Sequence, residues 1–193
     1  MPDTNIIWIV VALVAIAAVV SIVFARQSRQ RTAALRGRFG PEYDRAVEQY
    51  GGKAGERALA DRARRVEQIE FRDLSDTDRE RFTSSWTAIQ AQFVDDPGAA
   101  VARANDLIKE VMRARGYSAD AGFEQRAEEL SVDHPDVVQH YRAARELARA
   151  RTEHEGVNTE ELRQAVVHYR VLFADLLQPA RPAVSGVLRP AGA

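Results

Sequence analysis

Residues 6–25, IIWIVVALVAIAAVVSIVFA, form one unbroken apolar run near the start of the chain. The run contains no charged residue, no proline and no glycine, and Ser21 is its only hydroxyl. A helix rises about 1.5 Å per residue, so a run of this length spans roughly 30 Å, the thickness of the hydrocarbon core of a bilayer. The sequence therefore predicts a short N-terminal tail over residues 1–5, a transmembrane helix over residues 6–25 and a soluble body behind it.

A cleaved secretory signal peptide is the alternative interpretation of this run. Val23 and Ala25 satisfy the small-residue rule for a cleavage site. However, residues 1–5 contain no Lys or Arg and include Asp3, whereas a signal peptide begins with a positively charged region. The run is also longer than the usual apolar region of about 7–15 residues. We therefore expect the anchor to be retained.

The charged residues that flank the run predict its orientation. No Lys or Arg precedes the run, whereas five arginines and no acid follow it within residues 26–38. The positive-inside rule then places the N-terminus outside and the body in the cytoplasm. We expect residues 26–38 to form an Arg-rich juxtamembrane helix that anchors to lipid headgroups, each arginine contributing about 1 kcal/mol. A periplasmic body, with the topology reversed or the anchor cleaved, is the remaining alternative. The flanking arginines are Arg26, Arg29, Arg31, Arg36 and Arg38.

The composition narrows the class of the body. The formal net charge is −1 and acids and bases are interspersed, which argues against a nucleic-acid-binding protein. The chain contains no cysteine, so it has no disulfide, no thiolate metal site and no cysteine nucleophile. The body is rich in Ala, Arg, Glu and Leu and lacks the alternation typical of strands. We therefore predict an all-α protein.

Short connections between the expected helices favour a compact antiparallel helical bundle over residues 39–178. The following residues 179–193 contain proline and glycine and are expected to be mobile. Ser75 is expected to cap a helix, and residues 95–97 form a junction of a capping Asp and a proline. A short helix is expected over residues 123–130, followed by a second such junction at residues 131–135 with Asp133 as the cap. Large apolar residues recur at helical spacing in two segments and predict core faces. These core residues are Phe82, Trp86, Ile89 and Phe93, followed by Leu162, Val166, Tyr169 and Phe173.

No catalytic, cofactor-binding or phosphate-binding motif is present in the chain, and we predict no cofactor. Surface or hydrogen-bonded histidines are the expected case. His140 and His168 would meet only if their two helices pack together, with Asp136 or Glu146 nearby. If the two helices do pack together, an alternative function is possible: a membrane-tethered enzyme or metal-binding protein that uses these histidines and neighbouring carboxylates.

Several junction segments combine arginine, aromatic and acidic residues, as in RFGPEYDR at residues 38–45. Arg–carboxylate pairs and caps are expected to fix helix angles there, although the segments could also form a partner surface. They resemble a family of uncharacterised bacterial single-span membrane or secreted proteins with a helical soluble domain, over about residues 35–177. The resemblance implies a bacterial envelope protein and brings no activity or site residue. The other matching segments are FVDDP (93–97), RGY (115–117), LSVDHP (130–135) and HYR (168–170).

We therefore expect a membrane-anchored adaptor or scaffold in the bacterial plasma membrane, with the lipid bilayer and a protein as its partners. A contiguous exposed apolar patch of several hundred Å² on the body would mark the partner site. Neither the identity of the partner nor an oligomeric state follows from the sequence.

Overall fold

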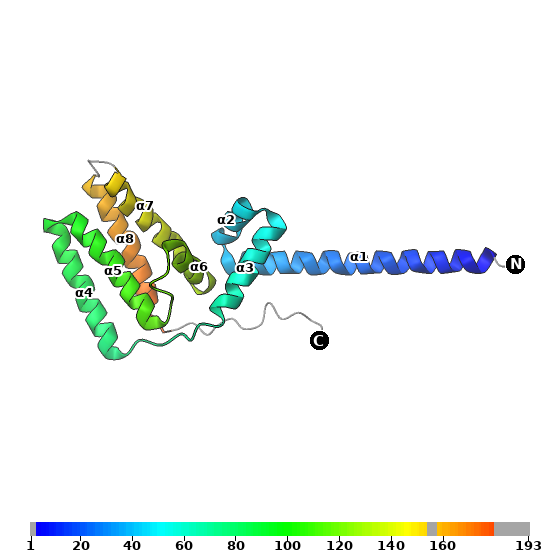
Figure 1. Cartoon of the computed structure of the whole chain (residues 1–193), viewed down its shortest axis with the longest axis horizontal. Coiled ribbons are helices and arrows are strands. Elements are labelled where there is room, and N and C mark those ends of the chain that lie inside the picture. The colour runs from blue at the N-terminus through cyan, green and yellow to red at the C-terminus, as the bar shows by residue number, and fades with distance from the viewer. Residues whose placement is uncertain (1–2, 154–157, 180–193) are drawn as a thin grey trace.

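One helix, α1 (Asp3–Phe39), carries the apolar run and continues beyond it without a break (Figure 1). Its segment Ala12–Phe39 is long and apolar enough to cross a membrane, and the apolar stretch within this segment is not buried inside the protein. Leu13, Ile16 and Phe24 are 60%, 60% and 69% exposed. In water such exposure would be unfavourable, at about 25 cal/mol per Å² of apolar surface. Length, composition and exposure are therefore all compatible with a membrane span.

The computed structural model describes residues 3–153 and 158–179 and confirms the predicted all-α fold. These residues contain no strand. The predicted mobile tail, residues 179–193, lies outside the described residues except for its first position. The remaining helices are α2 (Pro41–Tyr50), α3 (Gly52–Val66), α4 (Asp76–Asp95), α5 (Pro97–Arg115), α6 (Phe123–Asp133), α7 (Val138–Glu153) and α8 (Thr159–Leu176).

A small core, here called the proximal core, forms where α1 ends. Gly40 has φ of +50°, a conformation that favours glycine, and it lets the chain turn sharply so that Pro41 begins α2. Gly55 of α3 lies directly on α2, because a Cβ there would come within 2.7 Å of the carbonyl oxygen of Ala46. The buried residues of this core are Leu35, Phe39, Tyr43, Ala46, Leu59, Ala63, Val66 and Val132.

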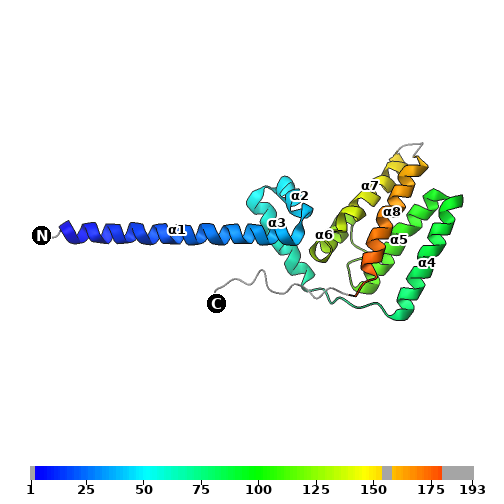
Figure 2. The same cartoon turned by 180° about the vertical axis from the view of Figure 1, so that it is seen from behind.

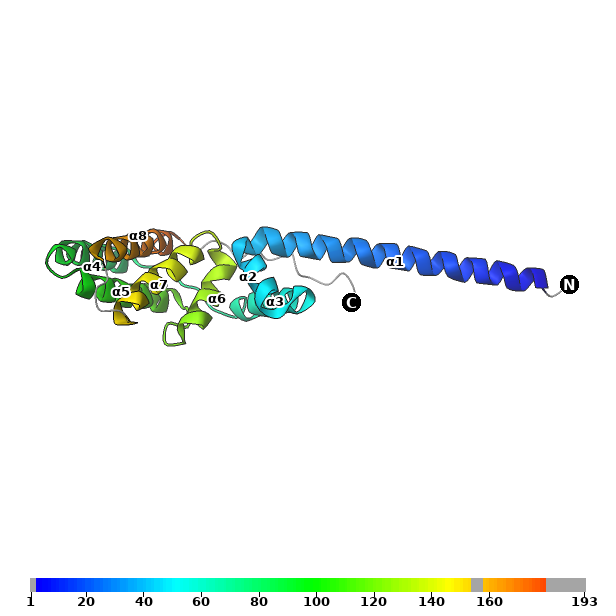
Figure 3. The ribbon, with the colours of Figure 1, turned by 90° about the horizontal axis from the view of Figure 1, so that it is seen from above.

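A larger core, the distal core, lies among α4, α5, α7 and α8, and Ala127 and Leu130 of α6 also belong to it. The pairs α4–α5 and α7–α8 are antiparallel, whereas α5 and α8 run in the same direction, so that Arg115 at the end of α5 bonds to Gln178 just after α8 (Figure 1). These helices form the end of the molecule farthest from the N-terminus, in views from both sides (Figures 1 and 2). The view from above shows α2 and α3 alongside the C-terminal end of α1, with α6 between that end and the distal helices (Figure 3). Trp86 and Phe173 stack at 4.9 Å between ring centroids. Every residue of the two core faces predicted from the sequence belongs to this core or packs against it.

The helix before residues 131–135 is expected to end at Leu130, and this predicted end is wrong. Helix α6 continues through Ser131 to Asp133, and His134 is its C-cap. The Ser131 hydroxyl bonds back to the carbonyl of Glu128, so it does not cap a new helix. Ser131 is instead fully buried and faces α3, which places it in the site described below.

Truncation of the Trp86–Phe173 stack should strongly destabilise the distal core. Phe173→Ala removes a buried ring and leaves a cavity, which typically costs about 3–5 kcal/mol of unfolding free energy. The measurement is urea unfolding of the full chain in mild detergent, followed by circular dichroism. Val94→Ala on α4 is the control, because Val94 is 83% exposed and its loss should change stability by less than about 0.5 kcal/mol. Equal effects of the two substitutions would contradict the packing described here.

Candidate functional site

The two cores are joined by a buried cluster of charged side chains, here called the ionic junction. Its centre is Glu42, at the start of α2, which is 1% exposed. The Glu42 carboxylate accepts hydrogen bonds from Nε (2.9 Å) and a terminal nitrogen (3.1 Å) of Arg142 on α7. The amide of Gln139 donates a further bond to the same carboxylate. A bidentate pair of this kind fixes both distance and orientation.

The ionic junction continues from Glu42 to α3 and α6. Arg62 of α3 lies 3.6 Å from the Glu42 carboxylate. It donates hydrogen bonds of 3.0 Å each to the Ser131 hydroxyl and to Glu128 on α6. Arg142 also donates a 2.7 Å bond to Glu124 of α6. The cluster thus ties α2 and α3, which pack on α1, to α6 and α7.

Charge pairing compensates for the burial of the ionic junction. Burial alone would lower the pKa of Arg142, but its hydrogen bonds to the carboxylates of Glu42 and Glu124 outweigh this effect and raise the pKa above its usual value. The guanidinium therefore stays charged beside a carboxylate that is almost inaccessible to water. Removal of one charge would leave the other buried and unpaired, which costs more than the intact pair contributes.

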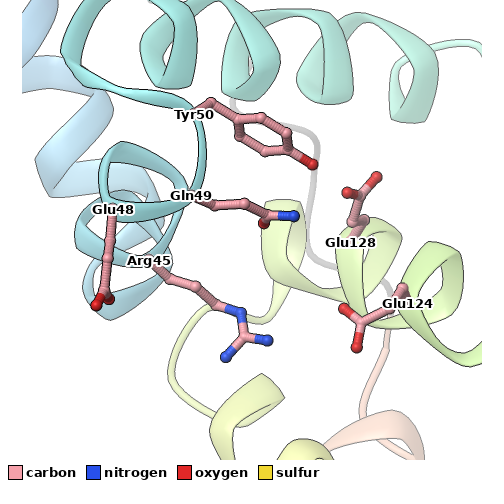
Figure 4. Close-up of a pocket in the computed structure, with 6 residues that line it drawn as sticks. All are labelled: Arg45, Glu48, Gln49, Tyr50, Glu124 and Glu128. Carbon is pink, nitrogen blue, oxygen red and sulfur yellow. The ribbon is translucent and has the colours of Figure 1, made fainter.

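A solvent-open cleft of about 480 Å³ borders the ionic junction, between α2 and α6 (Figure 4). The Tyr50 hydroxyl and the Gln49 amide point toward Glu128, and the Arg45 guanidinium points into the space facing Glu124, whereas Glu48 points away from α6. Glu124 and Glu128 have arginine partners. Arg45 makes no ion pair with any residue that the structure describes. Its charge is therefore available to a partner.

The five arginines that follow the apolar run divide into two groups. Three of them, Arg26, Arg29 and Arg31, are exposed along α1 before it reaches the body. The other two contact the body. Arg36 lies 4.9 Å from the centre of the Tyr43 ring, and Arg38 lies 3.8 Å from Glu67 on α3. Only the first group makes no contact with the body, and it lies on the part of α1 that directly follows the apolar run.

The histidines named in the alternative function do come together. His140 of α7 and His168 of α8 are 2.8 Å apart between their Nδ1 atoms, and both are half-buried. Burial, followed by the nearby His140, lowers the pKa of His168. Within the described ranges, however, no group of three or more His, Asp or Glu side chains is arranged to hold a metal ion. Neither Asp136 nor Glu146, the carboxylates expected nearby, therefore completes a metal site with the two histidines.

His134 lies at a helix boundary and is hydrogen-bonded, which is one of the two cases expected for the histidines. It is 3% exposed, and its Nδ1 atom bonds to Asp175 of α8. This contact ties the end of α6 to the distal core, close to the ring of Tyr117. His134 is thus neither a surface residue nor a neighbour of the other histidine pair.

The apolar patch expected as a partner site is not found on the described part of the body. Outside α1, its exposed large hydrophobic residues are Tyr50 on α2, Val94 on α4 and Val167 on α8. These are too few, and spread over too many helices, to form a patch of several hundred Å². A partner site on this surface would therefore be polar, and Tyr50 lines the cleft.

The sequence marked one part of the ionic junction and missed the rest. The segment at residues 38–45 indicated Arg–carboxylate pairing, and it contains Glu42. Its partner Arg142 is 100 residues away in the chain, and nothing in the local pattern around either residue indicates the pairing.

Comparisons with known proteins found no family model, no curated protein and no solved structure that matches this chain.

Loss of the Glu42 charge should destabilise the whole body. Glu42→Gln keeps the shape of the side chain but leaves Arg142 and Arg62 with an excess of buried positive charge, at a cost of about 3 kcal/mol. Urea unfolding of the full chain in detergent measures this cost. Glu48→Gln on the same helix is the matched control, because Glu48 is exposed, and it should change stability by less than about 0.5 kcal/mol. If the two variants were equally stable, Glu42 would not be a structural centre.

Proposed function

We propose that this protein is a single-pass protein of the bacterial plasma membrane, with its N-terminus outside and its body in the cytoplasm. The support is the exposed apolar part of α1 together with the charge distribution around it. Arg26, Arg29 and Arg31 follow the apolar run on the exposed part of α1, and no basic residue precedes the run. Cationic flanks stay on the cytoplasmic side.

The body acts as an adaptor that holds a protein partner at the membrane. The observation that carries this proposal is the continuity of α1, which runs without a break from the apolar span into the proximal core at Leu35 and Phe39. About ten residues separate the apolar run from Leu35, so the core begins roughly 15 Å from the end of the span. A helix without a flexible linker presents the body at a fixed distance and angle from the bilayer.

The cleft between α2 and α6 is the proposed partner site. It combines the Arg45 guanidinium, which makes no ion pair with a described residue, with the Gln49 amide and the Tyr50 hydroxyl, all on α2. Such a set of donors suits a carboxylate-bearing segment of a partner protein. Tyrosine and arginine are also enriched at protein interfaces, where each contributes both apolar area and hydrogen bonds. Tethering at the membrane raises the local concentration of a weakly bound partner.

The proposed orientation predicts which side of the membrane each end of the chain occupies. The chain has no native cysteine, so Val94→Cys and Asp3→Cys each introduce a single labelling site. In spheroplasts, a membrane-impermeant maleimide should label the Asp3 position before lysis and the Val94 position only after lysis. Labelling of the Val94 position in intact spheroplasts would place the body in the periplasm instead.

The adaptor proposal predicts a partner contact at the cleft. A photo-crosslinking amino acid at Tyr50 should form a discrete adduct with a second protein in cells that express the full chain. The same amino acid at Val94, an exposed position on α4, should not form this adduct. Arg45→Glu should abolish the Tyr50 adduct, because it repels an acidic partner. Identical adducts at both positions, or a Tyr50 adduct that survives Arg45→Glu, would contradict the proposed site.

A further inference from the structure

Helix α3 begins on the side of the body that is nearest to the apolar run. The Thr32 hydroxyl of α1 donates a 2.6 Å hydrogen bond to Glu56 in the second turn of α3. Arg38, near the end of α1, lies 3.8 Å from Glu67, which directly follows α3. Thr32 lies seven residues after Ala25, the last residue of the run, which corresponds to about 10 Å of helix. The headgroup layer is about 5–8 Å thick on each side of a bilayer, so the start of α3 lies close to its edge.

One face of α3 carries basic residues and points away from the rest of the body. Arg62 marks the opposite face, because it donates hydrogen bonds to two side chains of α6. Helix α6 lies on the side of α3 that is farther from the N-terminus of α1 (Figure 3). Successive helical residues are about 100° apart, so Lys53 points about 180° away from Arg62, and Arg57 and Arg64 lie within about 40° of Lys53. These three exposed residues form the basic face of α3, which points toward the membrane.

The body does not neutralise this basic face. Lys53 and Arg57 make no ion pair with any residue that the structure describes, whereas Arg64 pairs with Asp61. Of the exposed acids on α2 and α3, only Glu48 has no arginine partner within the described ranges. The exposed residues between the apolar run and α3 add further positive charge. They include Arg26, Arg29 and Arg31.

We propose that the basic face of α3 docks on anionic lipid headgroups of the bilayer that α1 spans. The inference rests on the proposed membrane span, which brings Lys53 and Arg57 to the level of the headgroups. Long basic side chains extend toward polar headgroups, and lipid phosphates accept charge-assisted hydrogen bonds from them. Each basic residue near an anionic surface adds to the attraction. The tilt of the body, and with it the orientation of the cleft between α2 and α6, then depends on the anionic lipid content of the membrane.

The test compares the full chain in nanodiscs of phosphatidylcholine alone with the full chain in nanodiscs that also contain phosphatidylglycerol. A spin label on Gly52→Cys reports on the start of α3, where an added Cβ meets no atom within 4 Å. Its collision rate with a neutral, water-soluble nickel chelate measures its exposure to water. This rate should fall about fivefold in the anionic discs, the factor that corresponds to the attraction of one basic residue. A label on Val94→Cys, an exposed position on α4, should not respond to the lipid.

Charge reversal identifies the residues responsible. Lys53→Glu combined with Arg57→Glu should remove the difference between the two kinds of disc. Arg103→Glu combined with Arg170→Glu is the matched control, because it makes the same change in charge at exposed positions of α5 and α8, and it should leave the difference intact. Circular dichroism checks folding, and Lys53→Gln with Arg57→Gln serves as the second variant if the charge reversal unfolds the body.

Incorporation into the discs and resistance to alkaline extraction test the membrane span separately. A chain that does not enter the bilayer would overturn both the span and the docking. A chain that enters both kinds of disc, with the Gly52 label equally exposed in both, would overturn the docking alone. A lipid effect that survives loss of the charges of Lys53 and Arg57 would also overturn it.

Discussion

The bidentate pair between the Glu42 carboxylate and the Arg142 guanidinium is the interaction on which the arrangement of the molecule depends. The proximal core packs α2 and α3 on the end of α1, and the distal core packs four other helices on one another. Helix α6 contributes apolar residues to both cores, Val132 to the proximal core and Leu130 to the distal core, and the ionic junction adds directional charge pairing at the same boundary. Bidentate charge pairing has directional geometry that apolar contacts lack, and this suits it to fix one set of helices against another.

The consequence is a continuous structural connection from the bilayer to the far end of the body. Helix α1 enters the proximal core at Leu35 and Phe39, and Glu56 of α3 accepts hydrogen bonds from Thr32 of α1 and Tyr43 of α2. The ionic junction then joins this unit to α6 and α7. A partner bound in the cleft between α2 and α6 would contact both sides of that connection. The histidine pair lies farther along, between α7 and α8, and is independent of the cleft.

Much of the fold follows from local sequence patterns. The apolar run, the helical spacing of Phe82 and Trp86, and the cap at Ser75 each depend on residues that lie within a few helical turns of one another. The sequence therefore predicts them. The ionic junction depends on Arg142 meeting a residue 100 positions away, and only the packed structure decides that. Ser131 illustrates the same limit, because the local pattern predicts that the helix ends before it, whereas α6 continues to Asp133 and the Ser131 hydroxyl accepts a hydrogen bond from Arg62 of α3.

The central claim is that the ionic junction fixes the body relative to the membrane helix, and a distance measurement tests it most directly. Arg31→Cys on α1 and Glu146→Cys on α7 place two spin labels on opposite sides of the ionic junction, at exposed positions in a chain without native cysteine. Pulsed electron spin resonance on the full chain in lipid nanodiscs should give one narrow distance distribution. Addition of Glu42→Gln should broaden it, whereas Glu48→Gln should not. A distribution that is already broad with Glu42 intact, or one that Glu42→Gln leaves narrow and unshifted, would contradict the account.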